Sequence, residues 1–112
     1  MSDFSMQHEH NGNATVLSIS GRVDSVTSGT MDTELENLIS ANKWVVVDFG
    51  NVEFLSSAGV RVLVKAMKTA KKSGHTVKLA AIPDHIAEVM KTLGMMEIMQ
   101  VYPSVEEAII SF

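Results

Sequence analysis

The sequence predicts a single α/β domain in which one mixed, mostly parallel sheet of about five strands packs against about four helices. Three observations support this fold class. The 112 residues suffice for one hydrophobic core but not for two. Strand-like and helix-like segments alternate in the order ββαβαβαβα. Residues 44–49 (WVVVDF) form a nearly apolar run, which is typical of a central strand covered on both faces.

The first two strands are expected to form a hairpin. Residues 4–10 place Phe, Met and two His at every second position, which indicates a half-buried strand. Asn11-Gly12-Asn13 tolerates positive φ angles and predicts the turn. Residues 14–20 then form the second strand, and Gly21 is expected to end it.

The first helix follows a polar connection over residues 22–28 and is expected to end at Asn42. Its apolar residues lie on one helical face: Met31, Leu35, Leu38 and Ile39. The third strand, residues 44–49, comes next. Strands on either side of such a helix are expected to run parallel through a right-handed crossover.

The second helix is expected after Ser56-Ser57, with Gly74 as its C-terminal stop. Its apolar stripe comprises Val60, Leu63, Val64 and Met67. Its basic face comprises Arg61, Lys65, Lys68 and Lys72. Four cations in an acidic chain fit a solvated helix face better than a nucleic-acid surface. Residues 76–82 predict the fourth strand.

The remaining elements are a third helix, a short fifth strand over residues 98–102 and a last helix. The third helix begins at Pro83-Asp84, closes at Gly94 and is expected to direct four apolar residues inward: Ile86, Val89, Met90 and Leu93. Ser104 and Glu107 have the spacing of a capping box for the last helix.

Composition excludes several functional classes. Nine basic and thirteen acidic residues give a net charge of −4, so we expect no broad attraction for nucleic acid or anionic lipid. The absence of cysteine rules out disulfides, cysteine-based zinc sites and thiol catalysis. The first residues lack the pattern of a signal peptide and no apolar run is long enough to span a bilayer, so a cytoplasmic protein is expected.

The most informative residues are Ser56 and Ser57, at the junction of a buried strand and a helix. A serine here either caps the helix or carries a phosphate, because the backbone N–H groups of a helix N-terminus lack internal partners. Two serines occur where one cap suffices, and the small residues Ala58 and Gly59 leave their hydroxyls accessible.

Other candidates for chemistry are weaker. Asp24 and Asp48 are expected near the edge where sites form in open α/β sheets, either as capping residues or as a paired acid/base site. His8 and His10 lack a third ligand at metal spacing. The serines lack the first glycine of a hydrolase nucleophile elbow, and the chain has no glycine-rich phosphate loop. Met95, Met96 and Met99 fit a core better than a docking surface.

Four motifs in order resemble a known family. They are Gly21-Arg22-Val23-Asp24 with Thr27, VVVDFGNVEF at residues 45–54, Ser56-Ser57-Ala58-Gly59-Val60, and the closing helix–Gly–strand–helix pattern at residues 86–108. In this arrangement the chain resembles the STAS domain, in the free-standing bacterial form of an anti-sigma-factor antagonist. The resemblance implies the STAS fold and covers nearly the whole chain, so we expect one STAS domain over residues 1–112.

The resemblance implies a partner switch and no enzyme activity, cofactor or metal of the chain's own. The unphosphorylated protein binds an anti-sigma factor that is also an ATP-dependent serine kinase, and thereby frees a sigma factor. Phosphorylation of Ser57, with Ser56 as second choice, ends binding, and a metal-dependent serine phosphatase restores it. The implied partner-binding residues are Asp24, Thr27, Ser56, Ser57, Ala58, Gly59 and Arg61.

Neither nucleic acid nor membrane is an expected partner, and a monomer or weak homodimer is expected. The alternative function is a STAS scaffold that binds its partners constitutively in a signalling or lipid-transport assembly. A scaffold of that kind would not respond to phosphorylation.

Overall fold

The computed structural model describes residues 3–112 and has nine elements in the predicted order. The strands are β1 (Ser5–Asn11), β2 (Ala14–Val23), β3 (Trp44–Leu55), β4 (Thr76–Ala80) and β5 (Val101–Tyr102). The helices are α1 (Thr27–Ala41), α2 (Ser57–Lys72), α3 (Asp84–Thr92) and α4 (Val105–Ile110). The five strands form one sheet in the order β1-β2-β3-β4-β5. β1 is antiparallel to β2 and the other pairs are parallel, which confirms the predicted fold class.

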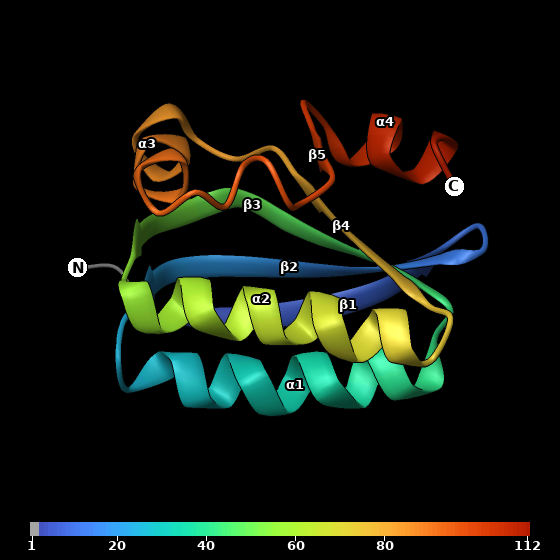
Figure 1. Ribbon diagram of the computed structural model, residues 1–112. Coiled ribbons are helices and arrows are strands. Elements are labelled where there is room, and N and C mark those ends of the chain that lie inside the picture. The colour runs from blue at the N-terminus through green and yellow to red at the C-terminus, as the bar shows by residue number, and fades with distance from the viewer. Residues whose placement is uncertain (1–2) are drawn as a thin grey trace.

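The sheet is covered by helices on both faces (Figure 1). α1 and α2 lie side by side on one face and enclose the main core, in which the predicted positions Met31, Leu35, Leu63 and Phe49 are fully buried. α4 covers the opposite face, where Ala108 packs in a smaller cluster with Val46 of β3. β3 is therefore buried on both sides, as its apolar sequence predicts. None of the helices within residues 3–112 combines the length and the apolar character that crossing a bilayer requires.

β2 and β3 extend further than predicted. Gly21 does not end β2, because its φ of +89° keeps the chain in the sheet and the missing Cβ leaves room for the carbonyl oxygen of Asp3. Beyond it, β2 continues to Val23, which pairs with Leu55 at the end of β3. β3 carries one extra residue at each of two register shifts, which bends it near its end. β2 and β3 consequently finish together, directly before α1 and α2 begin.

The C-terminal elements are shorter than predicted. β4 stops at Ala80 because the next residue, Ala81, has a φ of +58°. Leu93 was predicted to face inward and is 50% exposed, because the helix ends at Thr92 and Gly94 (φ +74°) redirects the chain. Ile98 is likewise exposed, in a turn that precedes β5, so the prediction of a strand from residue 98 is wrong.

α4 is fixed to the sheet by a buried lysine. Lys78 of β4 is only 4% exposed, and its Nζ donates a hydrogen bond to Ser111 Oγ at 2.6 Å. The same ammonium lies 4.2 Å from the ring centroid of Phe112, which stacks on Trp44 at 5.2 Å. At the start of α4, Ser104 Oγ accepts from the N–H of Glu107 at 3.1 Å, as the capping-box spacing predicts.

Candidate functional site

Ser56 is the N-terminal cap of α2. It has extended backbone angles (φ −83°, ψ 167°), and its Oγ accepts a hydrogen bond from the N–H of Gly59 at 3.2 Å. Its own N–H donates to the carbonyl of Val23 at 2.8 Å, which joins the start of α2 to the end of β2. Of the two sequence alternatives, capping is therefore what the Ser56 hydroxyl does.

Ser57 is the first residue of α2 and is exposed. Within residues 3–112 its hydroxyl makes no hydrogen bond. The adjacent serines thus differ in their use: Ser56 holds the helix end, and Ser57 presents a free oxygen at a rigid position.

The first turn of α2 is packed tightly against the sheet. Gly59 is buried, and a Cβ at this position would lie 2.6 Å from Leu55 Cδ1 and 2.8 Å from Val23 Cγ1. Only glycine permits this approach of the helix to β2 and β3 without displacing a core side chain. Ala58 is half-buried and faces the start of α1. The packing therefore fixes the backbone that carries Ser57.

The loop before α1 lies beside this turn and is closed by Asp24. Asp24 Oδ1 accepts the N–H groups of Val26 and Thr27, both at 2.9 Å. Thr27 Oγ1 in turn donates to the carbonyl of Arg22 at 2.8 Å and accepts the Asp24 N–H at 2.9 Å. The hydrogen bond from the Thr27 N–H, followed by that from Val26, holds the pKa of Asp24 below its usual value. Asp24 therefore serves as a capping residue for α1.

Asp48 does not join Asp24. Because β3 continues to Leu55, Asp48 is in mid-strand and not at the edge of the sheet, contrary to its predicted place. It accepts hydrogen bonds from Ser18 Oγ at 3.3 Å and from the Gly50 N–H at 2.9 Å. At about 3.3 Å per residue, it lies roughly 20 Å from the end of β3. The arrangement does not provide the paired acid/base site considered from the sequence.

Metal binding also lacks a structural basis in the part of the chain that is described. No group of three or more His, Asp or Glu residues within 3–112 is arranged to hold an ion. His8 and His10 are exposed on β1. His8 Nδ1 lies 3.3 Å from Glu34 Oε1 of α1, and His10 Nδ1 lies 3.0 Å from Thr15 Oγ1.

α3 contributes a surface that the sequence did not predict. Ser57 lines a shallow, largely apolar hollow of about 360 Å³ together with residues of α3 and the residue that follows it: Glu88, Val89, Thr92 and Leu93. α3 is anchored beside the end of β3 by His85, whose Nε2 lies 2.9 Å from the carbonyl oxygen of Glu53. One feature of the sequence indicates that Leu93 is exposed: it directly precedes Gly94. Because helices commonly end at such a glycine, the helical periodicity no longer predicts burial at Leu93.

Two more exposed apolar side chains lie near the ends of β2 and β3, where these strands lead into α1 and α2. Val26, in the loop before α1, is 81% exposed, and Phe54, two residues before Ser56, is 38% exposed. Arg22 lies over the Phe54 ring, with Cζ 4.2 Å from the centroid. Leu93 shares a hollow with Ser57, whereas Val26 lies in the loop before α1 and Phe54 lies near the end of β3. An apolar surface next to a polar centre is typical of a protein-binding site.

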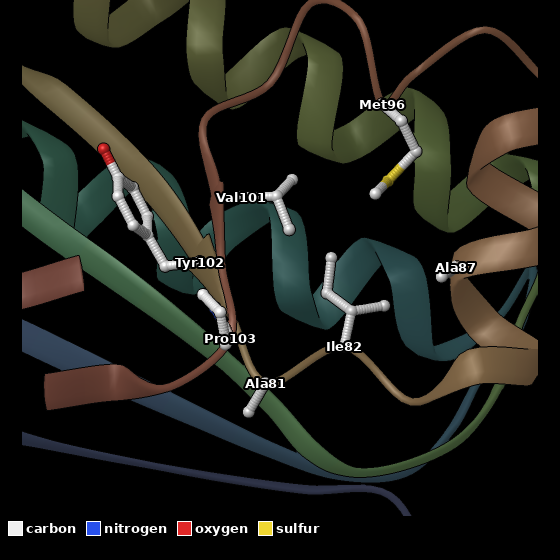
Figure 2. Close-up of a pocket in the computed structure, with 7 residues that line it drawn as sticks. All are labelled: Ala81, Ile82, Ala87, Met96, Val101, Tyr102 and Pro103. Carbon is white, nitrogen blue, oxygen red and sulfur yellow. The ribbon is translucent and has the colours of Figure 1, made fainter. Parts of the chain in front are cut away.

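The hollow shown in Figure 2 lies elsewhere and offers little chemistry. It has a volume of about 430 Å³ and is lined mainly by apolar residues such as Ile82, Met96 and Val101. Its one hydroxyl, on Tyr102, points away from these side chains (Figure 2). Convergent polar groups, which small-molecule sites require, are therefore lacking in this hollow.

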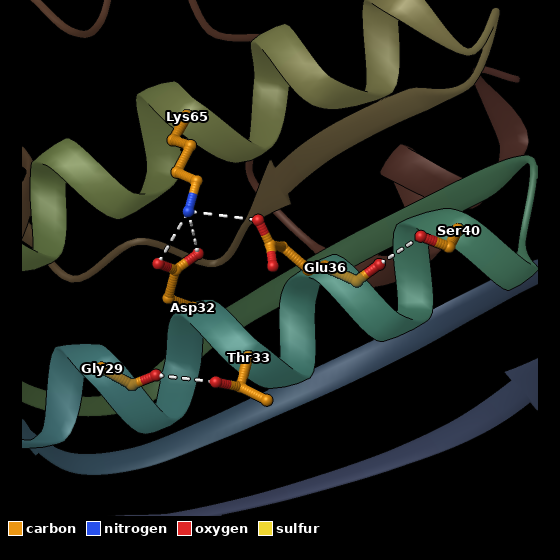
Figure 3. A network of polar contacts seen from close by, with 6 residues as sticks. All are labelled: Gly29, Asp32, Thr33, Glu36, Ser40 and Lys65. Carbon is orange, nitrogen blue, oxygen red and sulfur yellow. Dashed lines mark hydrogen bonds and ion pairs between the residues drawn. The ribbon is translucent and has the colours of Figure 1, made fainter.

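The basic face of α2 begins near Ser57 and is partly neutralised by α1. Lys65 Nζ lies 3.0 Å from Asp32 Oδ2 and 3.1 Å from Glu36 Oε1 (Figure 3). Hydrogen bonds to Asp32, and next to Glu36, raise the pKa of Lys65. Arg61 is exposed one helical turn after Ser57.

Comparisons with known proteins bear on the family and the fold. Residues 5–108 match the family model of the STAS domain. The anti-sigma-F factor antagonist RsfB of Mycobacterium tuberculosis is 31% identical over 96 residues, which cover 78% of this chain and 75% of RsfB. The crystal structure of an anti-sigma factor antagonist from Mycobacterium paratuberculosis superposes with a TM-score of 0.89 at 21% identity, covering 97% of this chain and 93% of that one.

A third similar structure is that of the Bacillus cell fate determinant SpoIIAA in its phosphorylated form. It superposes with a TM-score of 0.73 at 19% identity, over 96% of this chain and 98% of that one. The two structural likenesses show a shared fold.

Proposed function

This chain belongs to the STAS-domain family, and we propose that it is an anti-sigma-factor antagonist controlled by phosphorylation of Ser57. In the unmodified state it binds an anti-sigma factor that is also a serine kinase, and so releases a sigma factor in the cytoplasm. The phosphorylated form dissociates, and a serine phosphatase regenerates the binding form. The chain itself acts by binding and performs no turnover.

The observation that carries this proposal is the division of roles between the two serines. Ser56 Oγ accepts the capping hydrogen bond from the Gly59 N–H, so Ser57 can be modified without loss of that bond. The exposed Ser57 hydroxyl stands at the start of a helix that is packed tightly on the sheet. A phosphate here would change the surface and leave the core unchanged.

The chemistry requires only an accessible hydroxyl on this chain. Ser57 Oγ attacks the γ-phosphorus of the ATP bound by the kinase, and the bond from that phosphorus to the β–γ bridging oxygen breaks. ADP leaves, and the hydroxyl proton passes to a base on the kinase. Hydrolysis by the phosphatase replaces the serine oxygen on phosphorus with a water oxygen and returns the hydroxyl.

A single phosphate can account for the loss of binding free energy that such a switch requires. A hundredfold loss of affinity corresponds to about 2.8 kcal/mol. Phosphorylation adds about −1.5 to −2 charges next to the apolar side chain of Leu93, which a docked partner would cover. A charge that loses its water without gaining a partner costs at least that much.

The test is phosphorylation by an anti-sigma-type serine kinase from the same organism, with radiolabelled ATP. We expect one phosphate per chain on the parent protein and on Ser56→Ala, and none on Ser57→Ala. Label retained by Ser57→Ala and lost from Ser56→Ala would place the acceptor on the other serine. A partner that binds the parent and its phosphorylated form equally would instead favour the constitutive scaffold.

A further inference from the structure

Arg61 lies one helical turn beyond Ser57 on the same face of α2. Residues at positions i and i+4 of a helix have Cβ atoms about 6 Å apart. Helical side chains also lean toward the N-terminus, so a long side chain covers the turn that precedes its own Cα. For Arg61 that turn begins at Ser57, and both residues are exposed. The guanidinium can therefore reach a group attached to the Ser57 oxygen.

Arg61 is also available for such a contact. Within residues 3–112 it forms no ion pair, although Asp32 lines the same groove between α1 and α2. Asp32 is engaged by Lys65, one turn further along α2, and Glu36 binds the same ammonium (Figure 3). These two carboxylates of α1 are thus engaged by Lys65, and Arg61 has no ion-pair partner among the described residues.

The charges on the other sides of Ser57 would direct a phosphate toward Arg61. Glu88 of α3 lines the hollow that contains Ser57, and its carboxylate would repel a phosphate, although the Lys91 ammonium lies 4.0 Å from Glu88 Oε1. The Asp24 carboxylate, on the loop before α1, is engaged by the N–H groups of Val26 and Thr27. Among these neighbours, Arg61 is the group that offers positive charge from the same helix face.

We propose that Arg61 binds the phosphate of phosphorylated Ser57 within α2. This inference rests on the proposed function, which supplies the phosphate. A guanidinium presents two parallel N–H donors to phosphate oxygens, a geometry that the ammonium of lysine lacks. The pairing withdraws Arg61 from the surface around Ser57, so one modification changes two side chains that a partner meets.

The test needs no kinase, because phosphoserine can be incorporated at position 57 during synthesis of the chain. The phosphorus NMR signal is followed against pH for the parent phosphoprotein, Arg61→Gln, Arg61→Lys and the control Lys68→Gln. Lys68 is an exposed cation on the same helix, eleven residues from Ser57 or about 16 Å along the axis. At that separation its charge is largely screened at physiological salt.

An adjacent cation favours the doubly charged phosphate and lowers its second pKa. We therefore expect the second pKa of the phosphate to be about 0.5 lower in the parent than in Arg61→Gln. The value in Arg61→Lys should lie in between, and that in Lys68→Gln should equal the parent's. The effects of Glu88 and Lys91 on this pKa are the same in all four proteins, so they cancel from the differences. Circular dichroism checks that each variant is folded.

Two results would overturn the pairing: equal titration of the parent and Arg61→Gln, or an equal shift in Lys68→Gln. Either would leave the phosphorylation of Ser57 untouched. Conversely, failure of a kinase to label Ser57 would refute the proposed function, while the NMR comparison would still report whether the two side chains interact.

Discussion

Replacing each of the two serines by alanine should separate a structural hydroxyl from a functional one. Ser56→Ala removes the hydrogen bond from the Gly59 N–H to Ser56 Oγ (3.2 Å). Gly59 is buried, so solvent cannot easily replace the lost acceptor. Loss of a serine cap costs about 1 kcal/mol, with a range of roughly 0.5–2, and burial places this cap in the upper part of that range.

For a domain of 112 residues, the entropy of unfolding near the midpoint is about 0.24 kcal/mol per kelvin. A loss of about 1.5 kcal/mol therefore lowers the Tm of Ser56→Ala by about 6 °C. Ser57→Ala removes an exposed hydroxyl that has no partner among the described residues. Alanine also has a higher helix propensity than serine. The free energy of unfolding of Ser57→Ala should therefore equal that of the parent or exceed it by up to about 0.5 kcal/mol.

The assay is urea unfolding of the parent and both variants, with calorimetry for the Tm. Ser56→Ala should unfold at lower urea with an unchanged m-value, and Ser57→Ala should coincide with the parent or lie slightly above it. The opposite order, with Ser57→Ala destabilised by more than 1 kcal/mol and Ser56→Ala unaffected, would refute the assignment of the cap. Ser57 would then be the structural serine.

Three further predictions concern the packing, the loop and the docking surface. Gly59→Ala forces a methyl group against Leu55 and Val23 and should lower the free energy of unfolding by about 1–2 kcal/mol in urea titrations. Asp24→Asn should have a lower Tm than the parent at pH 7, and this difference in Tm should shrink as the pH falls. A lowered carboxylate pKa stabilises the fold above the ordinary value near 4, and that stabilisation is lost as pH falls through the lowered value. Thermal melts of both proteins from pH 7 to pH 2.5 would show a constant gap if Asp24 is not a charged cap. Leu93→Ser should leave the Tm nearly unchanged and weaken binding of the kinase by about tenfold, and unaltered binding by calorimetric titration would exclude Leu93 from the docking surface.

The order of elements was predictable because local periodicity encodes it. The stripe that begins at Met31 and the run at residues 44–49 each specify one element and its buried face. The ends of β2 and β3 were not predictable, because each strand continues only by pairing with the other. Gly21, a turn signal in isolation, stays in the strand where the chain near Asp3 approaches its backbone.

The candidate site was predicted in part for the same reason. The capping serine and its neighbour are adjacent in sequence, and Asp24 lies in a short loop whose turn chemistry is local. The position of α3 beside Ser57 depends on how distant segments pack, and no pattern within residues 84–94 reports it. Asp48 was misplaced because the extent of β3 was underestimated.

The most direct test of the phosphoserine switch is the affinity of one anti-sigma-type kinase for the chain with and without a phosphate on Ser57, measured by isothermal titration calorimetry. We predict binding of the unmodified chain and at least a hundredfold weaker binding of the phosphorylated form, with unchanged circular dichroism. Equal affinities for two equally folded forms would contradict it.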